Sequence, residues 1–238
     1  MGRLLGSGEF CEIQAGGINS IIYNFHKDKT VLKETLLEKI QKLDLNFNNI
    51  PRRIFLDTNV LQYIQDFGEY IFDNYCENEE YLVSPKKSII TKKDPLFAQI
   101  IALHDLFNGR GRDFFELALS DTVYEEVIKR KHKDFLSWFF EIWDYWQTTL
   151  ESYKSQPITQ QATQRYNIAR NDHSLLGNLS KLDKKIVLDA INLDCDALLT
   201  VDKFAKGNFQ LFVFEKYKLM VLRPTDLIEI ILPYQALF

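Results

Sequence analysis

The chain has 238 residues, of which 46% are hydrophobic and 26% are charged, and its formal net charge at pH 7 is −4. This size and apolar content suffice for one large core, whereas the acidic balance excludes general nucleic-acid binding by excess positive charge, so any such contact would rely on local basic patches. Three cysteines without a CxxC pair argue against a structural zinc site and favour a reducing compartment. With no apolar stretch approaching about 18 residues, we expect a cytoplasmic protein without a membrane span.

Residues 1–50 are predicted to be an extension that precedes the main domain. Five of the ten glycines fall within the first seventeen residues, which is typical of a loosely ordered leader or a small hairpin. Between residues 30 and 45, apolar side chains recur at intervals of three and four. This spacing predicts an amphipathic helix with Thr30 at its N-cap, packed as an accessory element.

The main domain is predicted to span residues 51–238 and to open with the apolar run Ile54-Phe55-Leu56, which ends at Asp57. Apolar residues at helical spacing follow, so we expect a buried strand that leads directly into a helix. Residues 74–93 contain acidic and lysine clusters and are predicted to be an exposed, irregular insertion. A helix should then begin at Asp94-Pro95, which supplies a capping residue and a first-turn proline, and end at the NGRGR segment.

A second strand is expected at residues 116–119, followed by a helix that carries Glu125 and Glu126 and begins at Ser120, Asp121 or Thr122. A second insertion is predicted at about 134–180. It contains an aromatic helix at residues 135–150 and a segment at 155–170, rich in glutamine and threonine, that forms either a loop or another helix.

The last part of the chain has the clearest alternation of strands and helices. A helix opens at Asp183, an apolar strand at residues 197–199 ends near Asp202, another strand covers residues 219–222, and a final helix follows Pro224. Strands that alternate with helices predict an α/β fold with a parallel sheet between two layers of helices.

Four acidic residues stand at the ends of predicted strands or near the beginnings of helices: Asp57, Glu126, Asp183 and Asp202. Open parallel sheets hold their ligands at the carboxyl ends of the strands. Carboxylates that converge there repel one another unless a cation lies between them, and a set of oxygen ligands favours Mg²⁺ or Mn²⁺. The pattern therefore indicates a nuclease that uses a divalent metal to cleave phosphodiester bonds.

The arrangement of these motifs resembles the PIN-domain family of metal-dependent nucleases, which includes many bacterial toxin ribonucleases and RNA-processing enzymes. The resemblance covers residues 53–232 and rests on four motifs in order. They are the strand that ends in Asp57-Thr58-Asn59, the pair Ser120 and Glu126, the set Asp183, Ile186 and Ala190, and the segment Thr200-Val201-Asp202-Lys203-Phe204.

The PIN resemblance implies a three-layer, Rossmann-like fold with a central parallel sheet flanked by helices. It also implies a Mg²⁺- or Mn²⁺-dependent nuclease that hydrolyses single-stranded RNA to a 5′-phosphate and a 3′-hydroxyl. Asp57, Glu126, Asp183 and Asp202 would be the catalytic metal ligands.

Two further residues are expected to support the acidic centre. Asn59 would orient Asp57 or, equally, be a polar residue of the first helical turn, and the Thr200 hydroxyl would bond the Asp57 carboxylate or a bound water. Three of the four acids have an alternative role, because Asp57 could cap the following helix, Glu126 could be a surface acid and Asp202 could stabilise a turn.

Two neighbouring acids compete with the assigned ones. Glu125 points about 100° away from Glu126 on the same helix, and only Glu126 has the family spacing. Asp189 lies on roughly the opposite helix face from Asp183 and is interpreted, with Asp194 and Asp196, as a surface or turn carboxylate.

Candidate substrate contacts come from a basic run after Glu126 and from the lysine after Asp202: Lys129, Arg130, Lys131 and Lys203. Such a run can contact phosphates or simply complement the end of a helix. The three tryptophans of the aromatic helix could stack on bases, but their close spacing favours core or subunit packing.

The principal alternative is a non-catalytic PIN-like protein that binds nucleic acid or serves as a scaffold. Full retention of four acids favours the enzyme. A phosphatase of the haloacid-dehalogenase type is disfavoured, because no second aspartate stands two residues after Asp57. The resemblance also leaves open a toxin role with an antitoxin-like partner, and a homodimer.

Overall fold

The structure is a computed structural model that describes residues 50–72, 81–83, 89–108, 115–130, 132–155, 159–173, 176, 179–205 and 207–237. The helix expected at residues 30–45 and the candidate substrate contact Lys131 lie outside these residues. Within the described ranges, none of the helices combines the length and apolar character needed to cross a membrane.

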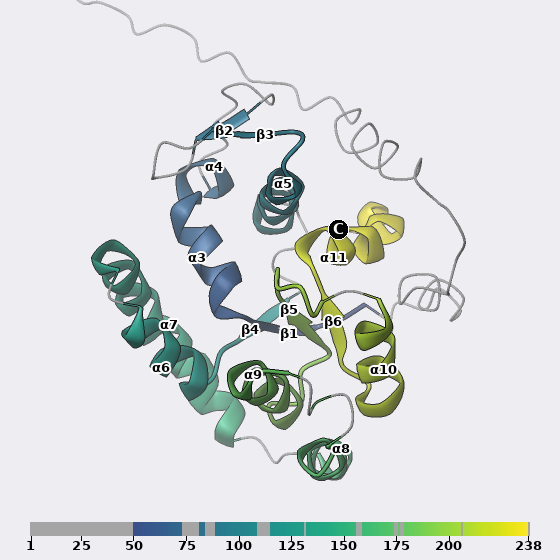
Figure 1. The fold of residues 1–238 in the computed structure, drawn as a ribbon. Helices are drawn as coiled ribbons and strands as arrows, with labels where there is room; N and C mark the ends of the chain where they lie inside the picture. The colour runs from purple at the N-terminus through teal and green to yellow at the C-terminus, as the bar shows by residue number, and fades with distance from the viewer. Residues whose placement is uncertain are drawn as a thin grey trace, which may run out of the picture.

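A parallel sheet of four strands forms the centre of the fold (Figure 1). Its strands are β1 (Arg53–Leu56), β4 (Glu116–Ala118), β5 (Ala197–Leu199) and β6 (Met220–Leu222), in the order β4-β1-β5-β6. The register pairs Phe55 of β1 with Ala118 on one side and with Leu198 on the other. Strands β5 and β6 are buried along their whole length, as expected for continuous apolar runs covered on both faces.

Helices cover both faces of this sheet (Figure 1). On one side lie α5 (Pro95–Asn108) and α11 (Pro224–Ile231), which pack against each other. On the other side lie α9 (Lys181–Asn192), which contacts β5, and α8 (Gln160–Arg170), which packs on α9. The predicted parallel α/β sheet between helices is therefore confirmed, and the arrangement is consistent with three layers.

The remaining described helices surround this centre. They are α3 (Thr58–Asp66), α4 (Gly68–Phe72), α6 (Asp121–Lys129), α7 (Lys133–Ser155), α10 (Asn208–Tyr217) and the 3₁₀ helix η4 (Leu232–Leu237). Helix α6 packs against α3, α7 and α9, and it thereby connects elements that lie far apart in the chain.

The strand order places a topological switch point between β1 and β5. From β1 the chain moves to β4 at one side, and it then returns across β1 to form β5 and β6 at the other side. Ligands of open α/β sheets bind outside the carboxyl ends of the strands at such a point. Asp57 directly follows β1 and Thr200 directly follows β5, so both lie at this edge.

Two elements differ from the sequence-based expectations. The segment predicted to be an irregular insertion contains an antiparallel pair, β2 (Tyr81–Val83) and β3 (Ile89–Thr91). Leu82 and Ile90 face each other in this pair and are both buried, so cross-strand packing gives the short runs a regular structure. The second unexpected element is helix α10, which lies between β5 and β6. The segment at residues 155–170, for which either a loop or a helix was expected, contains helix α8.

Candidate functional site

Asp57 lies buried at the carboxyl end of β1, with only 5% of its surface exposed. It occupies the N-cap position of α3, yet its side chain makes no capping hydrogen bond to that helix. Oδ2 instead accepts a 2.6 Å hydrogen bond from Oγ1 of Thr200, which is fully buried. The Asp57 backbone N–H donates to the Leu199 carbonyl at 3.1 Å. Its carboxylate is therefore directed toward the end of β5.

Burial raises the pKa of Asp57 from 3.8 to about 7. The Thr200 hydrogen bond opposes this shift, whereas the negative charges of Asp202 and Glu126 add to it. A carboxyl pKa near neutrality indicates that the surroundings compensate the negative charge of the ionised form poorly. Groups of this kind cluster at functional sites.

Asp202 follows β5 by three residues and interacts with the other acids. Burial raises its pKa, and Asp183 and Glu126 raise it further, while Arg130 and a hydrogen bond from Asn59 lower it. That bond runs from Asn59 Nδ2 to Asp202 Oδ1 over 2.6 Å. The expectation that Asn59 orients Asp57 is therefore wrong as to the partner, because α3 directs the amide toward Asp202.

Glu126 points from α6 toward α3, whereas its neighbour Glu125 points outward. Oε2 of Glu126 accepts a 2.7 Å hydrogen bond from the Thr58 hydroxyl, and Oε1 accepts one of 2.8 Å from Arg130 Nη2. Glu125 is more than half exposed and approaches Lys185 at 3.6 Å. The 100° separation of adjacent helix positions thus puts only Glu126 beside the sheet edge.

Asp183 lies in the first turn of α9, where the hydroxyl of the N-cap residue Ser180 accepts a 3.1 Å hydrogen bond from the Asp183 backbone N–H. Its carboxyl group is half-buried, and its charge acts on Asp202. Asp189 accepts a hydrogen bond from Thr122 of α6 and is also half-buried. The interpretation of Asp189 as a surface or turn residue is therefore wrong, because it connects α9 to α6.

The hydroxyl of Ser120 is buried and has no hydrogen-bond partner among the residues that the structure describes. Ser120 is the N-cap residue of α6 but makes no side-chain capping bond. It stands two residues beyond Ala118, and Asp57 stands two residues beyond the paired Phe55. A polar atom left unsatisfied at this edge is expected where a ligand or its hydration normally supplies the partner.

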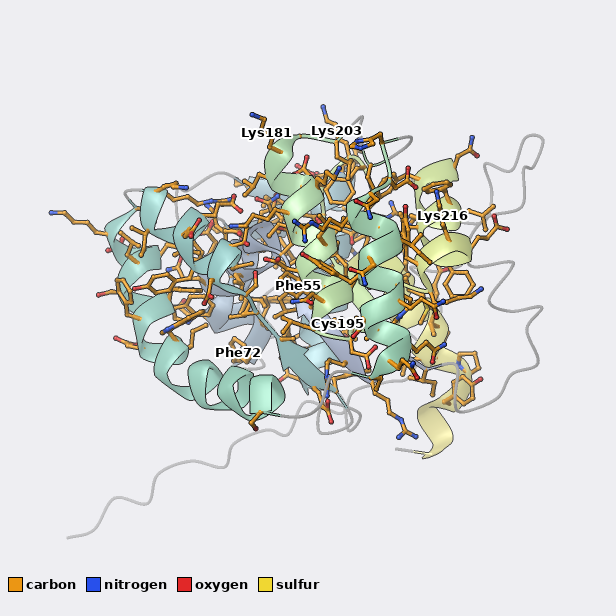
Figure 2. All side chains as sticks on the ribbon, turned by 90° about the horizontal axis from the view of Figure 1, so that it is seen from below. Phe55, Phe72, Lys181, Cys195, Lys203 and Lys216 are labelled. Carbon is orange, nitrogen blue, oxygen red and sulfur yellow. The ribbon has the colours of Figure 1, made fainter. Side chains whose placement is uncertain are left out.

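The candidate substrate contacts divide into two kinds. Lys129 and Lys203 are exposed. Figure 2 shows Lys203 and Lys181 extending from the same end of the molecule, whereas Cys195, which precedes β5, lies inside. Arg130 is different, because its guanidinium donates to Glu126, to Asn59 Oδ1 at 2.9 Å and to Gln62.

The aromatic helix α7 packs on the domain through its rings. Trp143 approaches Tyr124 of α6 with ring centroids 4.7 Å apart, and Trp138 stacks on Phe135 at 6.0 Å. Both tryptophans are half-buried, and the side chain of Trp146 lies outside the described part of the structure. Trp143 therefore packs between α6 and α7, and Trp138 packs against the hydrophobic core, which agrees with the core-packing interpretation.

The four acids form a donor set made only of oxygen atoms. Asp57, Glu126, Asp183 and Asp202 supply only carboxylate oxygens, and burial with mutual repulsion leaves Asp57 with a raised pKa. Hard cations such as Mg²⁺ and Mn²⁺ suit this chemistry. Among the described residues, however, no three acidic, histidine or cysteine side chains are arranged to hold a metal ion.

Two of the four acids are bonded to other side chains of the protein. Glu126 is bonded to Thr58 and Arg130, and Asp202 is bonded to Asn59. The carboxylate oxygens of these residues are of the kind that a divalent cation prefers, but as they are arranged, no three of the described side chains could hold one.

Comparisons of the chain with protein-family models, with curated proteins and with solved structures found no match in any of the three.

The sequence did not predict three of the residues that take part in the contacts between α3 and α6. They are Thr58 and Arg130, which bond Glu126, and Gln62, which bonds Arg130. The spacing of Glu126 and Arg130, four residues apart on one helix, was a local signal for their ion pair. Thr58 and Gln62 offered no such signal, because their contacts with α6 span 68 positions of the chain.

Proposed function

We propose that this chain is a PIN-like, Mg²⁺- or Mn²⁺-dependent nuclease that hydrolyses phosphodiester bonds in single-stranded RNA. One observation carries the proposal. Asp57 and Asp202 flank the switch point between β1 and β5, and Asp57 is buried with a pKa near 7 under the influence of two other acids. When a buried carboxyl group with a raised pKa ionises, its poorly compensated negative charge attracts a cation.

The roles of the residues follow from their contacts. Asp57, Asp202, Glu126 and Asp183 would hold the cation, which would supply an activated water and offset charge on the leaving oxygen. Thr200 holds the Asp57 carboxylate toward β5, and Asn59 holds that of Asp202.

The substrate is a polyanion, and the centre itself is acidic, so phosphate groups need basic contacts close by. Lys203 directly follows Asp202 and is exposed. Lys129 is exposed on the last turn of α6, the helix that carries Glu126. These two lysines would contact the backbone of the strand, and the preference for RNA over DNA derives from the PIN resemblance.

The test is incubation of the full-length chain with an end-labelled single-stranded RNA, with Mn²⁺ or with a chelator. We expect cleavage only with the metal, and products that carry a 5′-phosphate and a 3′-hydroxyl. A single-stranded DNA of the same sequence measures the preference for RNA. The proposal would be contradicted if the chain cleaved the RNA neither with Mg²⁺ nor with Mn²⁺.

A second candidate is a PIN-like module that binds single-stranded nucleic acid without cleaving it. Two observations favour it: Arg130 and Thr58 both bind Glu126, and no three of the described acidic, histidine or cysteine side chains are placed to hold a metal ion. Fluorescence anisotropy with a labelled RNA distinguishes the two candidates. Metal-independent binding of an RNA that stays intact would support the binding module.

A further inference from the structure

Lys181 and Lys203 extend into solvent from the same end of the molecule (Figure 2). Lys203 directly follows Asp202, beyond the carboxyl end of β5, and Lys181 is the first residue of α9, two positions before Asp183. The charge of Asp183 acts on Asp202, so the beginning of α9 and the segment after β5 lie close together. The two lysines therefore stand beside two of the acids at the carboxyl edge of the sheet.

The ammonium groups of these two lysines make no ion pair and no hydrogen bond with any residue that the structure describes. Lys185, one turn further along α9, behaves differently, because it approaches Glu125 of α6 at 3.6 Å. Lys181 and Lys203 each stand near an acid in the sequence and still pair with none. Within the described part of the chain, their charges are thus available to a ligand.

The position of Lys181 is unfavourable for α9 itself. The beginning of a helix carries the positive end of the helix dipole, so a cation in the first turn is disfavoured. The N-cap residue Ser180 accepts a hydrogen bond from the Asp183 backbone N–H at 3.1 Å and offers Lys181 no compensating charge. Residues that break a local rule without a structural gain are expected at functional sites.

A ligand that engages both ammonium groups has to carry negative charge at more than one place. The phosphate backbone of a nucleic acid has this property, and a single small anion does not. Lysine contacts phosphate as a point charge and does not read the base. Such contacts would also offset the repulsion between a polyanion and the acids beside the two lysines.

We propose that Lys181 and Lys203 together bind the phosphate backbone of a single-stranded nucleic acid at the carboxyl edge of the sheet. The inference rests on the proposed nucleic-acid function and adds Lys181 to the residues that hold the strand. It requires no metal ion, and it applies to the nuclease and to the binding module alike. Because phosphates are common to RNA and DNA, these two contacts do not discriminate between them.

Fluorescence anisotropy with a labelled oligouridylate of about twelve nucleotides, in a chelator, tests the proposal on the full-length chain. The variants are Lys181→Gln and Lys203→Gln, with Lys181→Arg to keep the charge. Lys218→Gln is the matched control, because Lys218 is exposed but lies two positions before β6, at the opposite edge of the sheet.

The dissociation constant is measured over a range of salt concentrations. Each phosphate contact to a single strand contributes about 0.7 to the slope of log K against log salt. We expect Lys181→Gln and Lys203→Gln each to lower the slope by about this amount and to weaken binding about fivefold at 0.1 M salt. Lys181→Arg and Lys218→Gln should retain the wild-type slope.

Circular dichroism establishes that each variant is folded. Wild-type slopes for folded Lys181→Gln and Lys203→Gln would overturn the inference and leave the proposed function standing, as long as the wild type binds or cleaves RNA. An equal loss of slope in Lys218→Gln would show that general charge accounts for the effect and would also overturn it. If the wild type neither binds nor cleaves RNA, the proposed function fails together with the inference.

Discussion

The hydroxyl of Thr200 donates a 2.6 Å hydrogen bond to the carboxylate of Asp57, and so joins two residues that lie 143 positions apart in the chain. Both follow the central strands of the sheet, β5 and β1, and both are buried. The bond stabilises the ionised form of Asp57 and opposes the effect of burial on its pKa. Through this bond, the packing of β5 beside β1 affects the pKa of Asp57.

Replacement of Thr200 by valine should shift the acidic limb of the cleavage profile to higher pH. Loss of a hydrogen bond to a charged group raises the pKa of Asp57, and the shift should be roughly one pH unit. The measurement is the rate of RNA cleavage with Mn²⁺ between pH 5 and 9. Thr200→Ser keeps the hydroxyl and should retain the wild-type profile, whereas an unchanged profile for Thr200→Val would count against the role of the bond.

Asp57 should make the metal-free protein less stable as the pH rises toward neutrality. Its pKa is about 7 in the folded state and 3.8 as the reference for the unfolded state, so the folded state binds the extra proton between these values. The resulting stabilisation is complete below about pH 4 and is lost as the pH rises through 7.

Urea unfolding of the wild type and of Asp57→Asn, with a chelator at pH 5 and pH 8, measures this effect. Asparagine cannot ionise, so the variant should gain stability relative to the wild type by on the order of 2 to 3 kcal/mol between the two pH values. A constant difference between the two proteins would show that Asp57 does not titrate in this range.

Asp196 should contribute to stability and not to cleavage. It precedes β5, and its Oδ2 accepts hydrogen bonds from the backbone N–H groups of Arg52 and Arg53, at 2.9 and 3.0 Å. These bonds hold the beginning of β1, at the edge of the sheet opposite to Asp57. Asp196→Ala should lower the free energy of unfolding by about 1 to 2 kcal/mol, measured by urea unfolding, and should leave the cleavage rate of the folded protein unchanged.

Asp183 and Asp189 offer a matched pair on one helix. Asp183→Asn removes a carboxylate whose charge acts on Asp202, whereas Asp189→Asn weakens the hydrogen bond to Thr122 on α6. We expect the first substitution to lower cleavage by at least about tenfold with little change in stability, and the second to lower stability by about 1 kcal/mol. The reverse pattern, in parallel assays of cleavage and thermal unfolding, would transfer the proposed role to Asp189.

The sheet could be predicted from the sequence because its strands have a strong local signal. The runs at β1, β5 and β6 are short, apolar and uninterrupted, and each stands before a helix or a turn. Helix α10 has no comparable signal, since its phenylalanines and leucine lie all around its axis and only Val213 and Tyr217 are buried among its residues. Apolar periodicity cannot reveal a helix of that kind.

The place of Asp57 and Asp202 at the carboxyl edge of the sheet could also be predicted from the sequence, because each stands shortly after an apolar strand. The partners of these acids could not. Whether Asn59 meets Asp57 or Asp202, and whether Arg130 faces solvent or Glu126, depends on how α3 packs against α6. Such long-range packing leaves no trace in the local spacing of residues.

Cleavage of one labelled single-stranded RNA, with Mn²⁺, by four forms of the chain tests the metal-dependent nuclease most directly. They are the wild type, Asp57→Asn, Asp202→Asn and Asp196→Asn, each shown to be folded. The first two variants change acids at the carboxyl edge of the sheet, and the third makes the same change at the opposite edge. We predict that wild type and Asp196→Asn cleave at similar rates, and that the other two lose on the order of a hundredfold or more. Equal rates for all four forms, or no cleavage by the wild type, would contradict the account.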